Sequence, residues 1–144
     1  MSAGASVTVR AALEDVAREV GGSLDAPLLS LGRPLLGDPG VATVGLESLD
    51  RVAGGLAWGA LPGEDLGAWL ARVPLGAPVA QVVALERPGA RGLLDRVMLL
   101  PTRERPVALE DVCTRLFLAG VGALRVIEVE PMRSLVAVIG RRRF

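Results

Sequence analysis

Two strand-like segments near the end of the chain are separated by only four residues. The segments read LRVIEVE (Leu124–Glu130) and LVAVI (Leu135–Ile139), and both are rich in β-branched residues. A parallel return between neighbouring strands needs a crossover of a dozen or more residues, so a connection this short allows only an antiparallel hairpin. The chain is therefore predicted to close with an antiparallel pair of strands.

Upstream of this hairpin, helix-like and strand-like segments alternate. Apolar residues recur at helical spacing in three segments, Val9–Val20, Gly63–Val73 and Val107–Ala119. Short apolar runs predict strands at Leu28–Leu31, Val41–Leu46, Gly55–Leu61 and Val79–Leu85. The stretch Gly92–Leu100 fits either a short helix or a strand. Such alternation predicts an α/β, Rossmann-like fold with a mostly parallel sheet flanked by helices, completed by the C-terminal antiparallel hairpin.

The composition limits both the core and the chemistry. A chain of 144 residues is long enough for one well-buried core, and we expect residues 1–144 to form a single domain. Because aromatic residues make up only 3 %, that core is expected to consist of Leu, Val and Ala. The absence of histidine excludes His-based triads, His metal sites and a His general base. Cys113, the only cysteine, lies on an apolar helical stripe and is expected to be a buried core residue.

The charged residues do not indicate a charged partner. The 16 acidic and 16 basic residues cancel, and both signs are scattered along the chain, so nucleic-acid binding is not expected. The exception is the run Arg141–Arg143, interpreted as a solvated end in preference to a site for phosphate or an acidic partner. No stretch is long and apolar enough to span a membrane, and the N-terminus lacks signal-peptide features. The sequence predicts a cytoplasmic protein with no membrane partner.

The order of elements in the second half of the chain resembles a known family. The segment AGVGALRVIEVEPMRSLVAVIGRR (Ala119–Arg142) looks like the C-terminal part of class I S-adenosylmethionine-dependent methyltransferases, where a final helix leads into a strand and a hairpin. The preceding WGALPGEDLGAWLARVPLGAPVAQVVALERPG (Trp58–Gly89) looks like the middle of these enzymes. The resemblance covers roughly Gly54 to Arg143 and rests on element order and hydrophobic texture.

The N-terminal half departs from the family pattern. The first motif of these enzymes is a strand ending in an acid, followed by a Gly-x-Gly-x-Gly turn whose glycines let the backbone approach the cofactor. In the segment LLSLGRPLLG (Leu28–Gly37), Ser30 stands in place of the acid and Gly32 matches the first glycine. Pro34 and Leu36 replace the other two glycines, which removes an N–H and adds side chains where a ligand needs space. The resemblance thus implies a shortened fold with a degenerate cofactor motif.

Two further observations concern the cofactor. Between Leu31 and Val41 the chain has no room for the first crossover helix, whose N-terminus would face the ligand. Glu47 follows VATVGL, where the second strand of the family often ends in an acid that binds the ribose hydroxyls, although an acid at a strand end is also commonly just solvated. We therefore expect no cofactor. Should S-adenosylmethionine bind, the candidate residues are Gly32, Glu47 and Trp58.

Three functions are compatible with these observations. The favoured hypothesis is a non-catalytic interaction, regulatory or scaffold protein that binds another protein or itself, because a mean hydropathy of +0.46 predicts excess apolar surface and a homodimer is the commonest result. The first alternative is a small S-adenosylmethionine-dependent methyltransferase. The second is a small-molecule or nucleotide sensor that uses the crevice at the strand C-termini, with Glu47 and Glu86 as lining residues.

Overall fold

The structure, a computed structural model, describes residues 2–35, 41–86, 106–130 and 134–143. Within these ranges the helices are α1 (Ser2–Glu19), α2 (Gly63–Arg72) and α4 (Leu109–Ala119). The strands are β1 (Leu28–Leu31), β2 (Thr43–Val44), β3 (Gly54–Trp58), β4 (Pro78–Ala84), β5 (Val121–Glu130) and β6 (Leu135–Arg142). The predicted alternation of helices and strands is confirmed. The ambiguous stretch Gly92–Leu100 lies outside the described residues.

The strands form one mixed sheet in the order β2-β1-β3-β4-β6-β5. The neighbours from β2 to β4 are parallel, whereas β6 is antiparallel to both β4 and β5. β4 pairs with β6 along its whole length, from Pro78 opposite Arg141 to Ala84 opposite Leu135. This arrangement confirms the predicted Rossmann-like α/β fold and the antiparallel hairpin at its C-terminal end.

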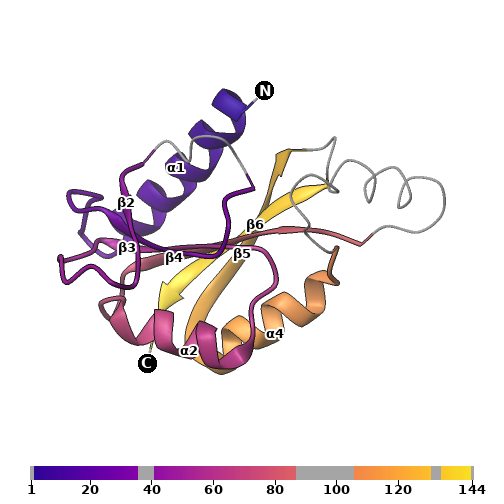
Figure 1. Ribbon diagram of the computed structural model, residues 1–144. Helices are drawn as coiled ribbons and strands as arrows, with labels where there is room; N and C mark the ends of the chain where they lie inside the picture. The colour runs from indigo at the N-terminus through magenta and orange to yellow at the C-terminus, as the bar shows by residue number, and fades with distance from the viewer. Residues whose placement is uncertain (1, 36–40, 87–105, 131–133, 144) are drawn as a thin grey trace.

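Helices cover both faces of the sheet: α1 lies on one face, and α2 and α4 lie on the other (Figure 1). The first face carries the α1-side core, formed by Val9, Leu13, Val16, Leu28, Leu35, Leu56, Trp58, Ala80, Val82, Ala84, Val129, Leu135, Ala137 and Ile139. The second carries the α2/α4-side core, formed by Leu29, Val52, Ala57, Leu66, Trp69, Leu70, Val73, Val79, Val83, Val112, Leu116, Val121, Val136 and Val138. Successive strand residues alternate between the two cores because side chains point to opposite faces of a strand.

Several elements differ from their predicted bounds. β6 extends to Arg142 instead of ending at Ile139, so Arg141 and Arg142 lie half-buried in the sheet and not in the predicted solvated end. β2 is only two residues long, and within the described sheet it is an edge strand that pairs with β1 alone, opposite Leu28 and Leu29. α1 ends at Glu19, so Val20 lies beyond the helix and is 45 % exposed instead of joining the buried stripe. The chain leaves this helix through Gly21, which adopts a φ of +74° as is typical of a glycine after a helix.

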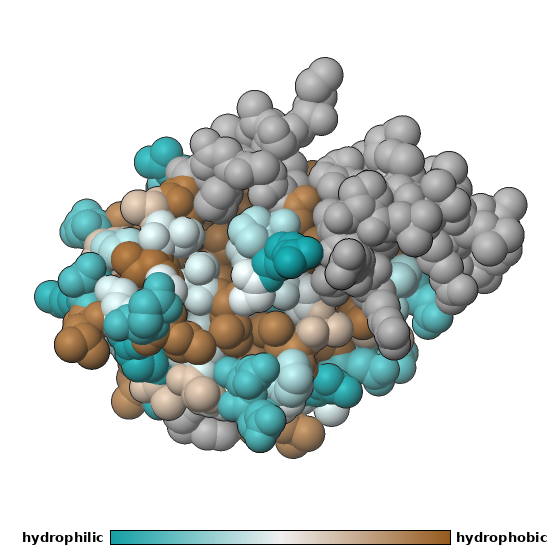
Figure 2. Space-filling model, viewed as in Figure 1, coloured by the Kyte–Doolittle hydropathy of each residue, from teal (hydrophilic) through white to brown (hydrophobic). Residues whose placement is uncertain are grey.

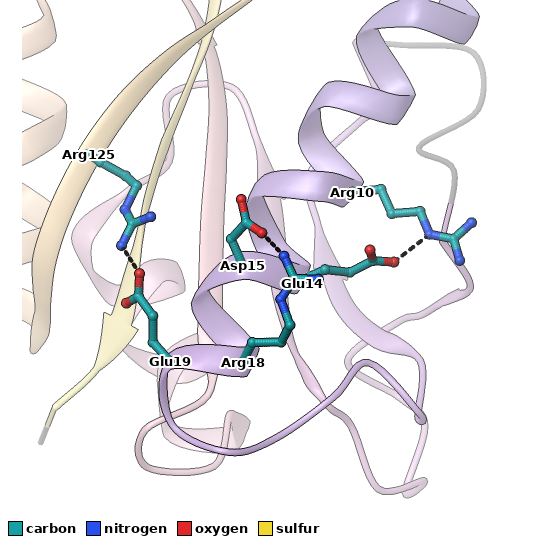
Figure 3. Close-up of polar contacts among 6 residues, drawn as sticks. All are labelled: Arg10, Glu14, Asp15, Arg18, Glu19 and Arg125. Atoms are coloured by element: carbon teal, nitrogen blue, oxygen red, sulfur yellow. Dashed lines mark hydrogen bonds and ion pairs between the residues drawn. The ribbon is translucent and has the colours of Figure 1, made fainter.

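The exposed side of α1 carries several polar contacts (Figure 3). Along α1, Arg10 donates to Glu14 at 2.8 Å and Arg18 pairs with Asp15. At the end of the helix, Arg125 of β5 donates to Glu19 at 2.6 Å and joins two segments far apart in the sequence. No helix within the described ranges is long and apolar enough to cross a membrane.

Replacing Glu19 by glutamine is expected to destabilise the fold slightly at about pH 7 and by a smaller amount at about pH 3. The hydrogen bond from Arg125 lowers the pKa of Glu19 below its ordinary value of 4.5. A carboxyl group whose pKa is lower in the folded chain stabilises the fold above its unfolded pKa, and this stabilisation is lost as the pH falls through the folded pKa. The test compares the urea unfolding midpoints of the wild type and of Glu19→Gln at both pH values. The same difference between the two midpoints at pH 7 and at pH 3 would contradict the prediction.

Candidate functional site

The parallel strands β1 and β3 end side by side at one edge of the sheet. Each is followed directly by a glycine with positive φ, Gly32 at +87° and Gly59 at +77°. Open α/β sheets bind their ligands at this edge, in the crevice outside the carboxyl ends of the strands. The residues around these two turns are therefore the first place to look for a functional site.

Gly32 is pressed against the end of β3. A Cβ atom built on Gly32 would lie 2.4 Å from the backbone oxygen of Trp58, far inside normal contact distance. A positive φ and a close backbone approach both favour glycine. In this structure the glycine is explained by the packing of β1 against β3, with no ligand needed to account for it.

Apolar side chains on either side of Gly32 lie in the core. Leu35 and Trp58 are each only 3 % exposed, and both belong to the α1-side core together with Val9 and Leu13. Leu35, three residues after Gly32, is thus part of the core and is not exposed at the turn. Gly32 and Trp58, two of the three candidate cofactor residues, thus come together as packing partners.

Glu47, the third candidate, lies elsewhere. It is exposed in the connection between β2 and β3, and its carboxylate oxygens lie 2.5 Å from where a Cβ atom would stand on Gly45. Arg72 donates to the backbone oxygens of Leu46 at 2.6 Å and Ser48 at 2.5 Å, which fixes this connection beside the C-terminal end of α2.

The position of α2 places Glu47 apart from the other two candidates. α2 starts at Gly63, after the carboxyl end of β3, and runs back toward Pro78 at the beginning of β4. The C-terminal end of α2 therefore lies toward the edge of the sheet at which β3 and β4 begin (Figure 1). Arg72 is the last residue of α2, whereas Gly32 and Trp58 lie at the carboxyl ends of β1 and β3. The structure does not bring Glu47 into one site with them.

A cavity of about 260 Å³ lies at the carboxyl ends of β3 and β4, between α2 and α4. It is lined by Ala60, Leu61, Leu66, Gln81, Glu86, Pro106, Val107, Ala108, Asp111, Val112 and Arg115. Glu86 was expected from the sequence to line a crevice at this edge, whereas Gln81, Asp111 and Arg115 were missed. The sequence could have indicated Gln81 as a candidate, because it is the single polar residue in the apolar run VAQVVAL.

Gln81 is the most unusual residue of this cavity. It is only 4 % exposed, and its Nε2 donates to the backbone oxygen of Gly59 at 2.7 Å. Its Oε1 is buried and has no hydrogen-bond partner among the residues that the structure describes. Buried polar atoms are nearly always paired in folded proteins, so an unpaired one requires an explanation.

A larger cavity, of about 660 Å³, lies at the opposite edge of the sheet, beside the beginnings of β3 and β4. Its lining consists mostly of small or apolar residues, with the exposed Asp25 and Arg51 among them. Cys113 belongs to neither cavity. It is half-buried against the α2/α4-side core, where burial raises the pKa of its thiol, so the prediction of a fully buried core residue was only partly right.

Comparison with known proteins identifies the fold. Neither a protein-family model nor a curated protein matches the sequence. Among solved structures, an S-adenosylmethionine-dependent methyltransferase from Thermotoga maritima, described as a possible histamine N-methyltransferase, matches with a TM-score of 0.56 and 11 % identity, over 96 % of this chain and 92 % of its own. The fold is that of the S-adenosylmethionine-dependent methyltransferases.

Two further structures with the methyltransferase fold show how much of longer proteins this chain covers. PigF with SAH matches with a TM-score of 0.55 and 14 % identity, over 96 % of this chain and 64 % of its own. Human N-acetylserotonin methyltransferase in complex with SAM matches with a TM-score of 0.50 and 14 % identity, over 71 % of this chain and 34 % of its own. The resemblance drawn from the sequence is thus confirmed for the fold, in a chain that spans only part of these two proteins.

Within the methyltransferase fold, the turn after β1 is where the resemblance places the methionine portion of the cofactor. Here the Cβ position of Gly32 faces the Trp58 oxygen, Pro34 offers no N–H, and Leu35 is packed into the core. The described residues of this turn therefore depart from the Gly-x-Gly-x-Gly pattern that the resemblance implies.

Proposed function

We propose that this chain is a non-catalytic protein of the methyltransferase fold, which acts by binding another protein or a second copy of itself. The observation that carries the proposal is the close packing of Gly32 against the Trp58 oxygen, 2.4 Å from a Cβ position. The buried Leu35 adds to it, because a side chain in the core leaves less space for a cofactor beside the turn.

Exposed apolar side chains support the association. Phe117 and Leu118, neighbours on α4, are 61 % and 74 % exposed, and Val126 on β5 is 42 % exposed. Among the described strands, β5 is an outer strand that pairs with β6 alone, so its other edge offers unpaired backbone groups to a partner. Figure 2 shows hydrophobic side chains at the surface among hydrophilic ones. Exposed apolar surface beside an open strand edge is typical of protein-binding sites.

The test is a calorimetric titration of the chain with S-adenosylmethionine, with the mass of the same sample measured by light scattering. We expect no binding heat up to about 1 mM ligand and a mass of at least twice 14.9 kDa. An active methyltransferase titrated under the same conditions is the positive control. Saturable heat with one site per chain would favour the alternative, a small methyltransferase, which the fold neighbours solved with SAM or SAH motivate.

A pair of variants tests whether the exposed surface of α4 forms the interface between associated chains. Leu118→Glu places a charge on α4 and is expected to shift the measured mass toward the monomer. Leu49→Glu is the matched control, because Leu49 is 97 % exposed in the connection between β2 and β3 and the charge change is the same. An equal effect of both variants would show that the α4 surface is not the interface.

A further inference from the structure

The starting point is the run Arg141–Arg143, which the proposed protein-binding role does not use. The first two arginines belong to β6 and are half-buried, whereas Arg143 is exposed. The backbone N–H of Arg142 donates to the Ala77 oxygen at 3.1 Å, and that of Arg143 donates to the Gly120 oxygen at 2.7 Å. Hydrogen bonds on both sides of the run therefore set the positions of these arginines in the sheet.

Alternation along β6 gives Arg141 and Arg142 different neighbours. Arg141 follows the buried Ile139 by two residues, so it faces the α1 side of the sheet. Arg142 faces the other side, where its Nη1 donates to the Val73 oxygen and, at 3.3 Å, to the Ala71 oxygen. These carbonyls lie at the C-terminal end of α2, where the helix dipole favours a cation. Arg142 is therefore explained by its contacts with α2.

Arg143 lies beside Arg141 on the α1 side. Gly122 of β5 pairs with Arg141, and it faces the α1 side because the neighbouring Val121 is buried in the α2/α4-side core. A Cβ atom on Gly122 would meet the side chain of Arg143. The missing side chain at Gly122 thus leaves the space in which Arg143 lies across β5.

Positive charge exceeds negative charge on this face. Glu19 accepts a hydrogen bond from Arg125 at 2.6 Å, and this bond, together with the charge of Arg141, lowers the pKa of Glu19. The side chains of Arg141 and Arg143 have no hydrogen-bond or ion-pair partner among the described residues, and the other acids of α1 that form ion pairs do so with arginines of the same helix. Three guanidinium groups against one carboxylate leave a net charge of +2 among these four residues.

The three arginines and Gly76 line an open cavity of about 310 Å³ at the end of β6. The N–H of Gly76 donates to the Arg142 oxygen at 2.7 Å, and no atom lies within 4 Å of its Cβ position. Gly76 also borders the larger cavity at this edge of the sheet, where the charges of Asp25 and Arg51 are opposite. The excess of positive charge is therefore concentrated at the smaller cavity.

The charge and the donor groups select the ligand chemistry. A guanidinium group presents N–H donors in a planar fork that matches phosphate oxygens. A phosphate monoester carries between about one and a half and two negative charges at neutral pH, close to the +2 of this face, whereas a carboxylate carries only one. A volume of 310 Å³ exceeds the roughly 150 Å³ that holds benzene, so a phosphate group with a small organic body fits.

We propose that the end of β6 binds a phosphate dianion, free or at the end of a small ester, with the guanidinium groups of Arg141 and Arg143 as its donors. The site lies where β4 begins, since Arg141 pairs with Pro78, and neither Gly32 nor Trp58 lines its cavity. It goes beyond the proposed function, and the absence of S-adenosylmethionine binding would not bear on it.

The experiment is an NMR titration of the isotope-labelled full chain with phenyl phosphate at about pH 7.5 and constant ionic strength. We expect saturable shifts of the backbone amides of Gly76 and Arg143. Phenyl sulfate, which matches the ester in shape but carries one negative charge, is expected to bind at least about fivefold more weakly. Equal affinity for the two compounds, or no saturable shift at about 20 mM phenyl phosphate, would overturn the proposal.

Two further probes distinguish the source of the charge. Inorganic phosphate that binds as tightly as phenyl phosphate supports the proposal with the free ion as ligand, and weaker binding of the ion supports it with an ester as ligand. A tetraglutamate peptide tests the carboxylates of an acidic protein segment. Tighter binding of this peptide than of phenyl phosphate would overturn the proposal in favour of an acidic protein partner.

Variants make the site specific. Arg143→Gln changes an exposed side chain and is expected to weaken the binding of phenyl phosphate at least about fivefold in a folded chain. Arg141→Gln is expected to have a similar effect. Arg33→Gln is the matched control, because Arg33 is an exposed arginine after the carboxyl end of β1 and does not line the cavity. Unchanged affinity in Arg143→Gln, or an equal loss in Arg33→Gln, would overturn the proposal.

Discussion

Replacing Trp69 by alanine is expected to lower the free energy of unfolding by about 3–5 kcal/mol. Trp69 is fully buried on α2 and packs directly over Gly55, where a Cβ atom would lie 2.5 Å from the indole Cζ2. Its Nε1 donates to the backbone oxygen of Leu29 at 2.8 Å. The truncation therefore opens a cavity between helix and sheet and removes a buried hydrogen bond that joins β1 to α2.

The more conservative Trp69→Phe separates these two effects. Phenylalanine fills much of the same space but cannot donate to the Leu29 oxygen, so a smaller loss of about 1–3 kcal/mol is expected. Urea unfolding followed by circular dichroism suits both variants, since the substitutions themselves change tryptophan fluorescence. A Trp69→Phe protein as stable as the wild type would show that the hydrogen bond contributes nothing, and the loss in Trp69→Ala would then be packing alone.

Local patterns in the sequence were sufficient for the elements that bury one regular face. The stripe of Leu66, Trp69, Leu70 and Val73 is buried as predicted, because helical spacing alone determines which residues of α2 meet the sheet. The hairpin of β5 and β6 followed from the length of its turn, which leaves no room for a parallel return. Both features are set by residues close together in the sequence.

The candidate site depended on contacts between distant residues, which no local pattern encodes. Glu47 follows an apolar run and was placed at the strand ends, but Arg72 holds its connection beside the far end of α2. Gln81 was visible as a polar residue in an apolar strand, yet its partner is the Gly59 oxygen 22 residues earlier. Gly32 matched the first glycine of a cofactor turn, and only the structure places Trp58 against it.

Replacing Gly32 by alanine is expected to lower the free energy of unfolding by about 3 kcal/mol or more. One part of the loss is conformational, because a φ of +87° costs an alanine about 1–2 kcal/mol. The other part is the new Cβ atom, 2.4 Å from the Trp58 oxygen, which forces the exit of β1 away from the end of β3. Both strands are central to the sheet, so the displacement cannot be confined to a surface loop.

Two other glycines separate the parts of this effect. Gly76 has a similar φ of +81° but nothing within 4 Å of its Cβ position, so Gly76→Ala should cost only about 1–2 kcal/mol. Gly67 lies in α2 with open space around it, and Gly67→Ala should stabilise the chain by up to about 1 kcal/mol. The difference between Gly32→Ala and Gly76→Ala in urea unfolding measures the contact with Trp58. If the two losses are equal, there is room beside Gly32 for a cofactor, and the main support for a non-catalytic protein is lost.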